Sequence, residues 1–377
     1  MKFVIARQEL NGLISKANNI VANKGTIPIL SNFLIEASND ELTLTATDLT
    51  AGIRCYAKAK VLEEGATTVP ARCFAPLMRE LTSHHVEISS NDNDVIDIVA
   101  DTSAFKMHGM NKSEFPSLPD FADSTHFKVK HDALKEALFR TSFAVSREDN
   151  RYILMGVCMK IADGTMTFTG TDGRRLARVY ATIDIDKAFA REYVLPIKAV
   201  EEINKCFETS DEQDLNVYLM DDKVAFEGNR VTFITKLISG DYPELDRVIP
   251  EGSDVVVNLH REELMTLLRQ ISLFTAHTTC SVRFTFCDGE LKITANTMDV
   301  GEGKVSMPVN YQGPQLDIAF NPGFFLDILR HSKQEIISMG LTDSFNPGIV
   351  TDGEMPATMT SLPNPLFVLM PMRLNEE

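Results

Sequence analysis

One order of predicted strands and helices occurs three times along the 377 residues, with a period close to 125 residues. Each copy opens with a short alternating strand that leads into a helix. These openings lie at residues 3–10, 127–134 and 257–264. In each helix, apolar or small residues recur at i, i+3, i+4 and i+7, so they share one face. A repeat of this length predicts three homologous domains.

Two further elements recur in the same order inside each copy. A strand lies at residues 42–48, 166–172 and 291–297, and a second helix begins near residues 72, 198 and 323. Runs of short strands with turn signals such as Asn39-Asp40 and Asp163-Gly164 fill the remainder. Because strand runs separate the helices, we expect an α+β fold with antiparallel sheets and two helices per domain on one side.

Polar, proline-containing stretches at residues 111–126 and 249–254 mark the predicted domain boundaries. The three domains are predicted at residues 1–122, 123–253 and 254–377. Both stretches are short, which suggests domains held edge to edge rather than tethered loosely.

The charge of the chain restricts its partners. There are 37 lysines and arginines against 53 aspartates and glutamates, for a formal charge of −16, which argues against a broadly basic surface. The helices predicted at 7–19, 72–81, 131–143, 198–207, 261–271 and 323–333 carry +1, +1, 0, 0, 0 and +1. These charges sum to +3 and leave −19 for the rest of the chain. The helices can therefore present a weakly positive surface in an acidic protein.

Motifs for catalysis and for metal binding are missing from the sequence. It contains no GxGxxG, GxxxxGK[ST], HExxH or GxSxG motif, and its six cysteines include no CxxC pair. We therefore expect no catalytic residue, no metal and no cofactor. The first residues hold no leader-like apolar run and no stretch of about 18 apolar residues follows, so we expect a cytoplasmic protein without membrane contact.

Five segments resemble the bacterial DNA polymerase III beta subunit family, the sliding clamps. They are Thr26–Asn32, Ala66–Arg72, Gly170–Ala177, Tyr242–Pro250 and Val368–Leu374, and the resemblance runs the length of the chain. It implies a DNA polymerase processivity factor: a head-to-tail homodimer that forms a closed ring around duplex DNA without sequence specificity. It also implies that the replicative polymerase, the clamp loader and repair proteins bind through short peptide motifs, with no chemical step.

The number of helices fits a ring. Two copies would supply twelve helices, and at ~9 Å spacing these give a circumference of ~110 Å. The hole is then ~25 Å wide after one helix diameter is allowed for, which admits a solvated duplex. The basic residues expected to line it are Lys16, Lys24, Arg72, Arg79, Lys135, Arg140, Lys198, Lys205, Arg269, Arg330 and Lys333.

The resemblance also assigns three groups of site residues. The DNA-contact positions are Lys24, Arg72, Glu148, Arg151, Tyr152, Ile153 and Lys198. The apolar peptide cleft comprises Leu154, Thr171, Gly173, Arg174, Arg175, Leu176, Pro243, Arg247, Val248, Val368, Met370, Pro371, Met372, Arg373 and Leu374, with Asn321, Phe324 and Phe345 on its far side. The dimer interface comprises Phe105 and Met107 against Leu273 and Phe274, with Asp299 and Glu302 near and Lys106 as a basic partner.

Other interpretations remain open at this point. The alternative interpretation of Leu154, Leu176 and Val248 is that they belong to the buried core. The same alternative holds for the apolar interface residues. An enzyme could use the loop of Asp172, Arg174 and Arg175 on an anionic substrate, although no neighbouring nucleophile or base is evident. A third possibility is an adaptor that binds the same peptides but never encircles DNA.

Overall fold

The computed structural model describes residues 1–22, 27–91, 93–207, 214–276, 280–298, 300–353, 355 and 362–373. The chain forms two compact units. Unit 1 contains Met1–Lys135, Ile183–Ile185 and Lys198–Leu237, and unit 2 contains Glu136–Thr182, Asp186–Ile197 and Ile238–Glu377. Each unit is described by itself.

Six α-helices are present in the described residues, two for each repeat, as the periodicity predicts. They are α1 (Arg7–Ala17), α2 (Ala71–Glu80), α3 (His131–Ser142), α4 (Ile197–Cys206), α5 (Arg261–Ser272) and α6 (Pro322–His331). Each lies within two residues of its predicted bounds. None of the described helices has the length and apolarity needed to cross a membrane.

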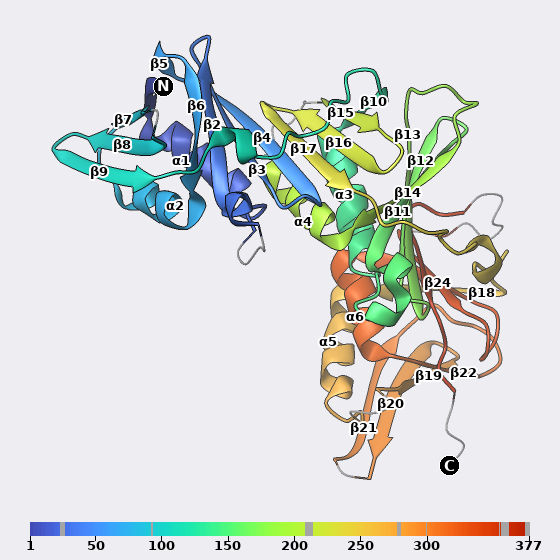
Figure 1. The fold of residues 1–377 in the computed structure, drawn as a ribbon. Helices are drawn as coiled ribbons and strands as arrows, with labels where there is room; N and C mark the ends of the chain where they lie inside the picture. The colour runs from blue at the N-terminus through green and yellow to red at the C-terminus, as the bar shows by residue number, and fades with distance from the viewer. Residues whose placement is uncertain are drawn as a thin grey trace. The chain divides into compact units, whose positions relative to one another are not determined.

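Antiparallel pairing joins the strands into four sheets, two in each unit (Figure 1). The first has the order β5 (Lys60–Glu63), β1 (Lys2–Ala6), β7 (His85–Ser90), β8 (Val95–Ala100), β9 (Ser103–His108). The second has the order β10 (Thr125–Lys130), β15 (Asp214–Leu219), β16 (Lys223–Gly228), β17 (Val231–Lys236), β4 (Ala51–Lys58), β3 (Glu41–Thr47), β2 (Asn32–Ser38), β6 (Gly65–Pro70). Both belong to unit 1.

The two sheets of unit 2 repeat this plan. One has the order β14 (Arg191–Pro196), β11 (Gly156–Ala162), β12 (Thr165–Thr171), β13 (Arg175–Thr182), β25 (Leu366–Leu369), β24 (Gly348–Asp352), β23 (Ile336–Leu341), β18 (Val255–His260). The other has the order β21 (Gly301–Pro308), β20 (Glu290–Thr297), β19 (Val282–Cys287), β22 (Leu316–Phe320). Short 3₁₀ turns lie at Pro28–Ser31, Lys112–Glu114, Asp149–Met155 and Asp246–Val248.

Each eight-stranded sheet combines strands of two predicted domains. In unit 1, β17 of the central domain pairs with β4 of the first domain. In unit 2, β25 of the third domain pairs with β13 of the central domain. Backbone hydrogen bonds therefore run through both joints, which confirms the prediction that the domains meet edge to edge.

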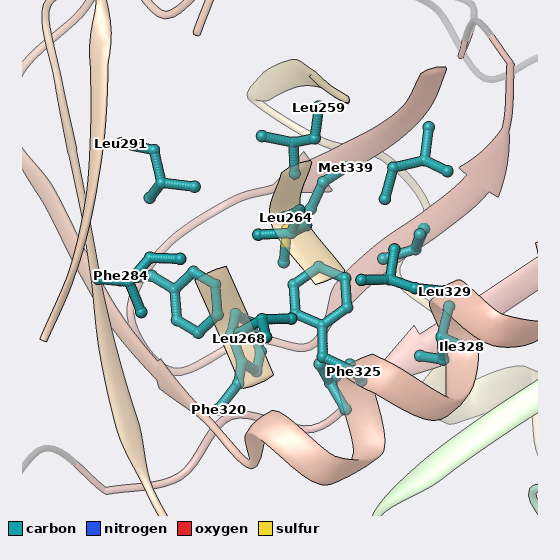
Figure 2. Packing of buried hydrophobic residues seen from close by; sticks show 14 of the residues in the cluster. Leu259, Leu264, Leu268, Phe284, Leu291, Phe320, Phe325, Ile328, Leu329 and Met339 are labelled. Atoms are coloured by element: carbon teal, nitrogen blue, oxygen red, sulfur yellow. The ribbon is translucent and has the colours of Figure 1, made fainter. Parts of the chain in front are cut away.

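The apolar helix stripes form the core. Leu10, Leu13, Ile14 and Ala17 of α1 are buried, as their spacing predicts. In the third repeat, Leu264 and Leu268 of α5 pack with Phe325 of α6 and Phe284 of β19 (Figure 2). Hairpin turns also follow the sequence: Asn39, Asp40 and Asp163 adopt positive φ angles, which these turn residues tolerate.

Arg140 of α3 departs from the prediction. It is expected to be an exposed basic residue of the lining, but it is only 7% exposed, so this prediction is wrong. Its Nη1 lies 2.5 Å from Asp352 Oδ2 of β24, and its Nε donates to Glu136. Burial alone would lower the pKa of Arg140, but these two carboxylates outweigh burial and raise it. Arg140 therefore anchors α3 to the sheet.

We expect the substitution Arg140→Met to lower the free energy of unfolding of unit 2 by about 3–5 kcal/mol, because Asp352 would remain buried without a counterion. Asp352 has a side chain only 6% exposed. Urea denaturation followed by circular dichroism measures the loss. The matched control is Arg330→Met, since Arg330 pairs with Asp327 while 52% exposed; we expect it to cost less than about 1 kcal/mol. Equal losses in the two variants would contradict the assignment.

Candidate functional site

The predicted cleft residues all belong to unit 2, and strand pairing brings several of them together. In the joint between β13 and β25, Leu176 lies opposite Val368. Both are buried in one small apolar cluster with Ile249. Beyond β25, the Met370 N–H donates to the Arg174 carbonyl at 3.0 Å. Met370 is thus held against the turn that precedes β13.

The C-terminal segment is fixed at a second point. The Met372 N–H donates to the Ala319 carbonyl of β22 at 2.8 Å. Two residues after Ala319, the Asn321 side chain accepts hydrogen bonds from the Gly323 and Phe324 N–H groups and so caps α6. Leu374 lies outside the described residues.

Arg175 is the most constrained side chain of the group. Its Nη1 lies 2.7 Å from Asp327 Oδ2, its Nη2 donates to the Phe143 carbonyl at 2.9 Å, and its Nε lies 3.2 Å from Asp172 Oδ2. The guanidinium carbon lies 4.6 Å from the centre of the Phe324 ring and 5.4 Å from that of Phe143. Arg175 therefore connects β13, α6 and the end of α3.

These contacts bear on the alternative enzyme interpretation. The Arg175 side chain is only 10% exposed, and each of its three nitrogens has a protein acceptor. Asp172 is occupied as well, because its Oδ1 accepts from the Arg174 and Arg175 N–H groups. A loop whose charged groups are already paired offers little to an anionic substrate.

The turn before β13 requires glycine. Gly173 has a φ of +82°, and a Cβ there would lie 2.4 Å from the Arg151 guanidinium. Arg151 in turn donates to the Asp172 carbonyl at 2.9 Å. A side chain at residue 173 would disturb both the turn and the position of Arg151.

The repeat supplies the same turn in unit 1, but there it is covered. Thr47 pairs with Gly52 as Thr171 pairs with Leu176, so Gly52 corresponds to Leu176. A Cβ on Gly52 would lie 2.4 Å from Leu118, a residue of the linker stretch 111–126 at the first predicted boundary. Unit 1 thus has a glycine where unit 2 has Leu176, and a linker side chain lies beside that glycine.

Exposure separates the cleft residues into buried and accessible groups. Leu154, Leu176 and Val368 are at most 8% exposed, whereas Val248 and Met370 are 42% and 37% exposed. Phe345 is 87% exposed. Arg247 and Pro243 are also exposed, and Arg247 pairs with Glu244 at 3.1 Å. The accessible apolar side chains are suited to contact a hydrophobic anchor.

The DNA-contact positions are divided between the units. In unit 1, Arg72 is exposed and Lys198 Nζ lies 2.6 Å from Asp48 Oδ2. In unit 2, Glu148 and Arg151 are exposed, Tyr152 is 62% exposed, and Ile153 packs on an apolar cluster. Lys24 lies outside the described residues.

The interface positions lie on sheet edges and a helix end. Phe105 and Met107 belong to β9, the end strand of its sheet, and Phe105 is 38% exposed. Leu273, just after α5, is 73% exposed, while Phe274 packs against the core of the third repeat. Glu302 is exposed on β21, and Asp299 lies outside the described residues.

Two partners of Arg175 were not predicted from the sequence. Phe143 lies 32 residues before Arg175 and Asp327 lies 152 residues after it, and no motif links them. The one available signal is position: Asp327 interrupts the apolar run from Phe324 to Leu329, between Leu326 and Ile328.

Comparisons with known proteins agree along the whole chain. Residues 1–119, 128–244 and 246–363 match the N-terminal, central and C-terminal domains of the DNA polymerase III beta subunit. The beta sliding clamp of Chlamydia pneumoniae is 50% identical over 377 residues and 100% of both chains. That of Haemophilus influenzae is 28% identical over 99% of this chain and 100% of the other. The crystal structure of the DNA polymerase III subunit beta from Pseudomonas aeruginosa is similar with a TM-score of 0.92, 27% identity and coverage of 99% and 100%.

We expect Arg175→Lys to lower the free energy of unfolding of unit 2 by about 2 kcal/mol, because lysine cannot form the same set of hydrogen bonds or stack in the same way. Arg247→Lys is the matched control, since that side chain is 85% exposed, and it should leave stability unchanged. Thermal and urea unfolding of both variants check the difference. An Arg175→Lys variant as stable as the wild type would show that the contacts of Arg175 do not stabilise the fold.

Proposed function

The chain belongs to the DNA polymerase III beta subunit family, the beta sliding clamps, and from that membership we propose that two copies close head to tail into a ring around duplex DNA. It acts as a DNA polymerase processivity factor. The proposed ring would tether the polymerase to DNA by topology and would catalyse no reaction. Its place of action would be the cytoplasm, where the bacterial chromosome lies.

The proposal of a ring rests on the strands at the edges of the sheets. By the order of the repeat, β9, β17 and β25 are equivalent strands, and so are β4, β13 and β21. Within the chain β17 pairs with β4 and β25 pairs with β13. In the described sheets, the remaining members β9 and β21 are end strands. Pairing of β9 from one copy with β21 of the next would repeat the same joint, and two copies would close the circle.

The two internal joints predict the register of the third. Phe233 lies opposite Ile53 and Phe367 lies opposite Ala177. Phe105 occupies the same place in β9 as Phe233 does in β17. Gly303 corresponds to Ile53 and Ala177, because each of the three lies opposite an equivalent residue of the preceding strand. The register therefore places Phe105 of one copy opposite Gly303 of the other.

This register would bring the predicted interface residues of the two copies into contact. A Cβ on Gly303 would lie 2.9 Å from the Phe274 ring, so an incoming Phe105 would meet Phe274. The next pair is Lys106 opposite Glu302, two side chains of opposite charge. Directly opposed charge pairs of this kind stabilise an antiparallel joint and oppose a shift of one residue.

Charge supports weak and mobile contact with DNA. With the observed bounds, the helices carry +1, +1, 0, 0, 0 and 0, for a sum of +2, because α6 ends before Lys333. Lys198, Lys205, Arg330 and Lys333 each contact a carboxylate, which weakens their attraction to phosphate. Arg72, Arg79 and Arg269 are exposed. A small positive charge would retain DNA without holding it at one position.

The peptide cleft is proposed for the accessible side chains of Val248, Phe345 and Met370 above the buried Leu176 and Val368. Partners would be the replicative polymerase, the clamp loader and repair proteins, each through a short peptide with a large hydrophobic anchor. The flexible methionine thioether suits anchors of different shapes.

A cysteine pair tests the ring and its register together. In a Cys73→Ser background, which removes the exposed native thiol, the change Lys106→Cys with Glu302→Cys should give a covalent dimer under mild oxidation. Directly opposed residues have Cα atoms within ~6 Å, the distance that a disulfide spans. Non-reducing electrophoresis measures the yield, and the oxidised protein should stay on circular DNA at high salt but leave linear DNA.

The matched control for the register is Lys106→Cys with Lys304→Cys, in which the second thiol is moved by two residues along β21. We expect at least a tenfold lower cross-linking rate, since the Cα separation would exceed the reach of a disulfide. Similar rates in both variants would refute the register. A monomer at micromolar concentration by light scattering would refute the ring.

Deletion of Met370–Glu377 tests the cleft. We expect it to reduce binding of a polymerase-derived peptide more than 100-fold, because the deletion removes Met370 and the segment held by Arg174 and Ala319. Fluorescence anisotropy with a labelled peptide measures the affinity. Deletion of residues 375–377 alone is the control and should change the affinity less than twofold. Unchanged binding after the longer deletion would exclude the assignment.

A further inference from the structure

A polar pocket lies beside the proposed peptide cleft in unit 2. Its volume is about 250 Å³, and its floor is formed by side chains of β11, β12 and β13. The segment Tyr242–Asp246 forms its wall. No residue of the proposed cleft except Pro243 lines it.

The sheet register fixes the distance between cleft and pocket. Thr169 of the pocket is two residues from Thr171 of the cleft, and Arg178 of the pocket is two residues from Leu176. Residues two apart on a strand point to the same face and lie ~7 Å from each other. The pocket is therefore the next position along the same face, and Pro243 borders both.

Two of the three acidic groups of the pocket already have cationic partners. Asp246 Oδ1 lies 2.8 Å from Arg178 Nη1, and Glu244 pairs with Arg247 at 3.1 Å. Glu192 lies opposite Lys160 in the sheet and helps burial, the larger cause, to raise the pKa of the Cys158 thiol. Asp246 and Glu244 therefore need no further partner from a ligand.

The donors of the pocket are less well matched. The Arg178 side chain is only 16% exposed. Its Nε is buried and has no acceptor among the described residues. Within the same part of the chain, Lys160 forms no hydrogen bond or ion pair, and the Thr167 and Thr169 hydroxyls donate to no acceptor. A buried donor without an acceptor is costly, so a ligand that brings acceptor oxygens would be stabilised here.

We propose that this pocket is a subsite for an acidic side chain of the partner peptide, which reaches Lys160 and Arg178 while the hydrophobic anchor of the peptide occupies the cleft. The inference rests on the proposed peptide-binding function. An extended peptide advances ~3.3 Å per residue, so the acidic residue should lie two or three residues from the anchor. The subsite would add selectivity for acidic peptides to a cleft that recognises mainly apolar groups.

Matched peptides test the subsite on the full-length protein. A polymerase-derived peptide with both ends blocked would carry either Glu or Gln two or three residues from its anchor, on either side. We expect one Glu peptide to bind about tenfold more tightly than its Gln counterpart in fluorescence anisotropy, because only the carboxylate forms charge-assisted hydrogen bonds. The preference should fall to less than twofold in Lys160→Gln and persist in Lys187→Gln, an exposed lysine outside the pocket.

Any other result would contradict the proposed subsite. Equal affinities of all Glu and Gln peptides for the wild-type protein would overturn it, and so would a preference that survives Lys160→Gln. The parent peptide without the added residue separates the two claims. If it binds, the cleft is intact and only the subsite is judged; if it does not bind, the peptide-binding function fails and the subsite with it.

Discussion

Antiparallel pairing of edge strands is the interaction on which the rest of this protein depends. A sheet edge exposes unpaired N–H and C=O groups, and a repeat domain with two such edges can join its neighbours at both. The chain uses this joint twice, between β17 and β4 and between β25 and β13. The equivalent strands that remain at the ends of the described sheets, β9 and β21, are those proposed to join two copies.

Buried arginines fix the helices to these sheets in unit 2. Arg140 pairs with Asp352, and Arg175 pairs with Asp172 and Asp327. Both guanidinium groups are largely removed from water, where planar, multiple hydrogen bonds compensate for lost hydration. Their charge is consequently not available to DNA or to an anionic substrate. The basic residues that can attract phosphate are fewer than the number of lysines and arginines suggests.

The joint in unit 2 differs from the joint in unit 1 by a few side chains. Leu176 occupies a position that is Gly52 in the first repeat, where Leu118 of the linker lies close to the backbone. The equivalent positions thus hold a buried leucine in unit 2 and a glycine beside a linker leucine in unit 1. The peptide cleft is proposed beside the leucine of unit 2.

The sequence by itself determined the repeat, the six helices within two residues and the hairpin turns, because these depend on local periodicity and turn chemistry. It also supported membership in the clamp family through motifs spread along the chain. Only the tertiary structure decided which arginines are buried, which partners they have and where a polar pocket lies. Phe143, Arg175 and Asp327 lie far apart in the chain and meet only after the sheets and helices pack. Long-range contacts of this kind leave no periodic signal, since they depend on the relative position of whole elements.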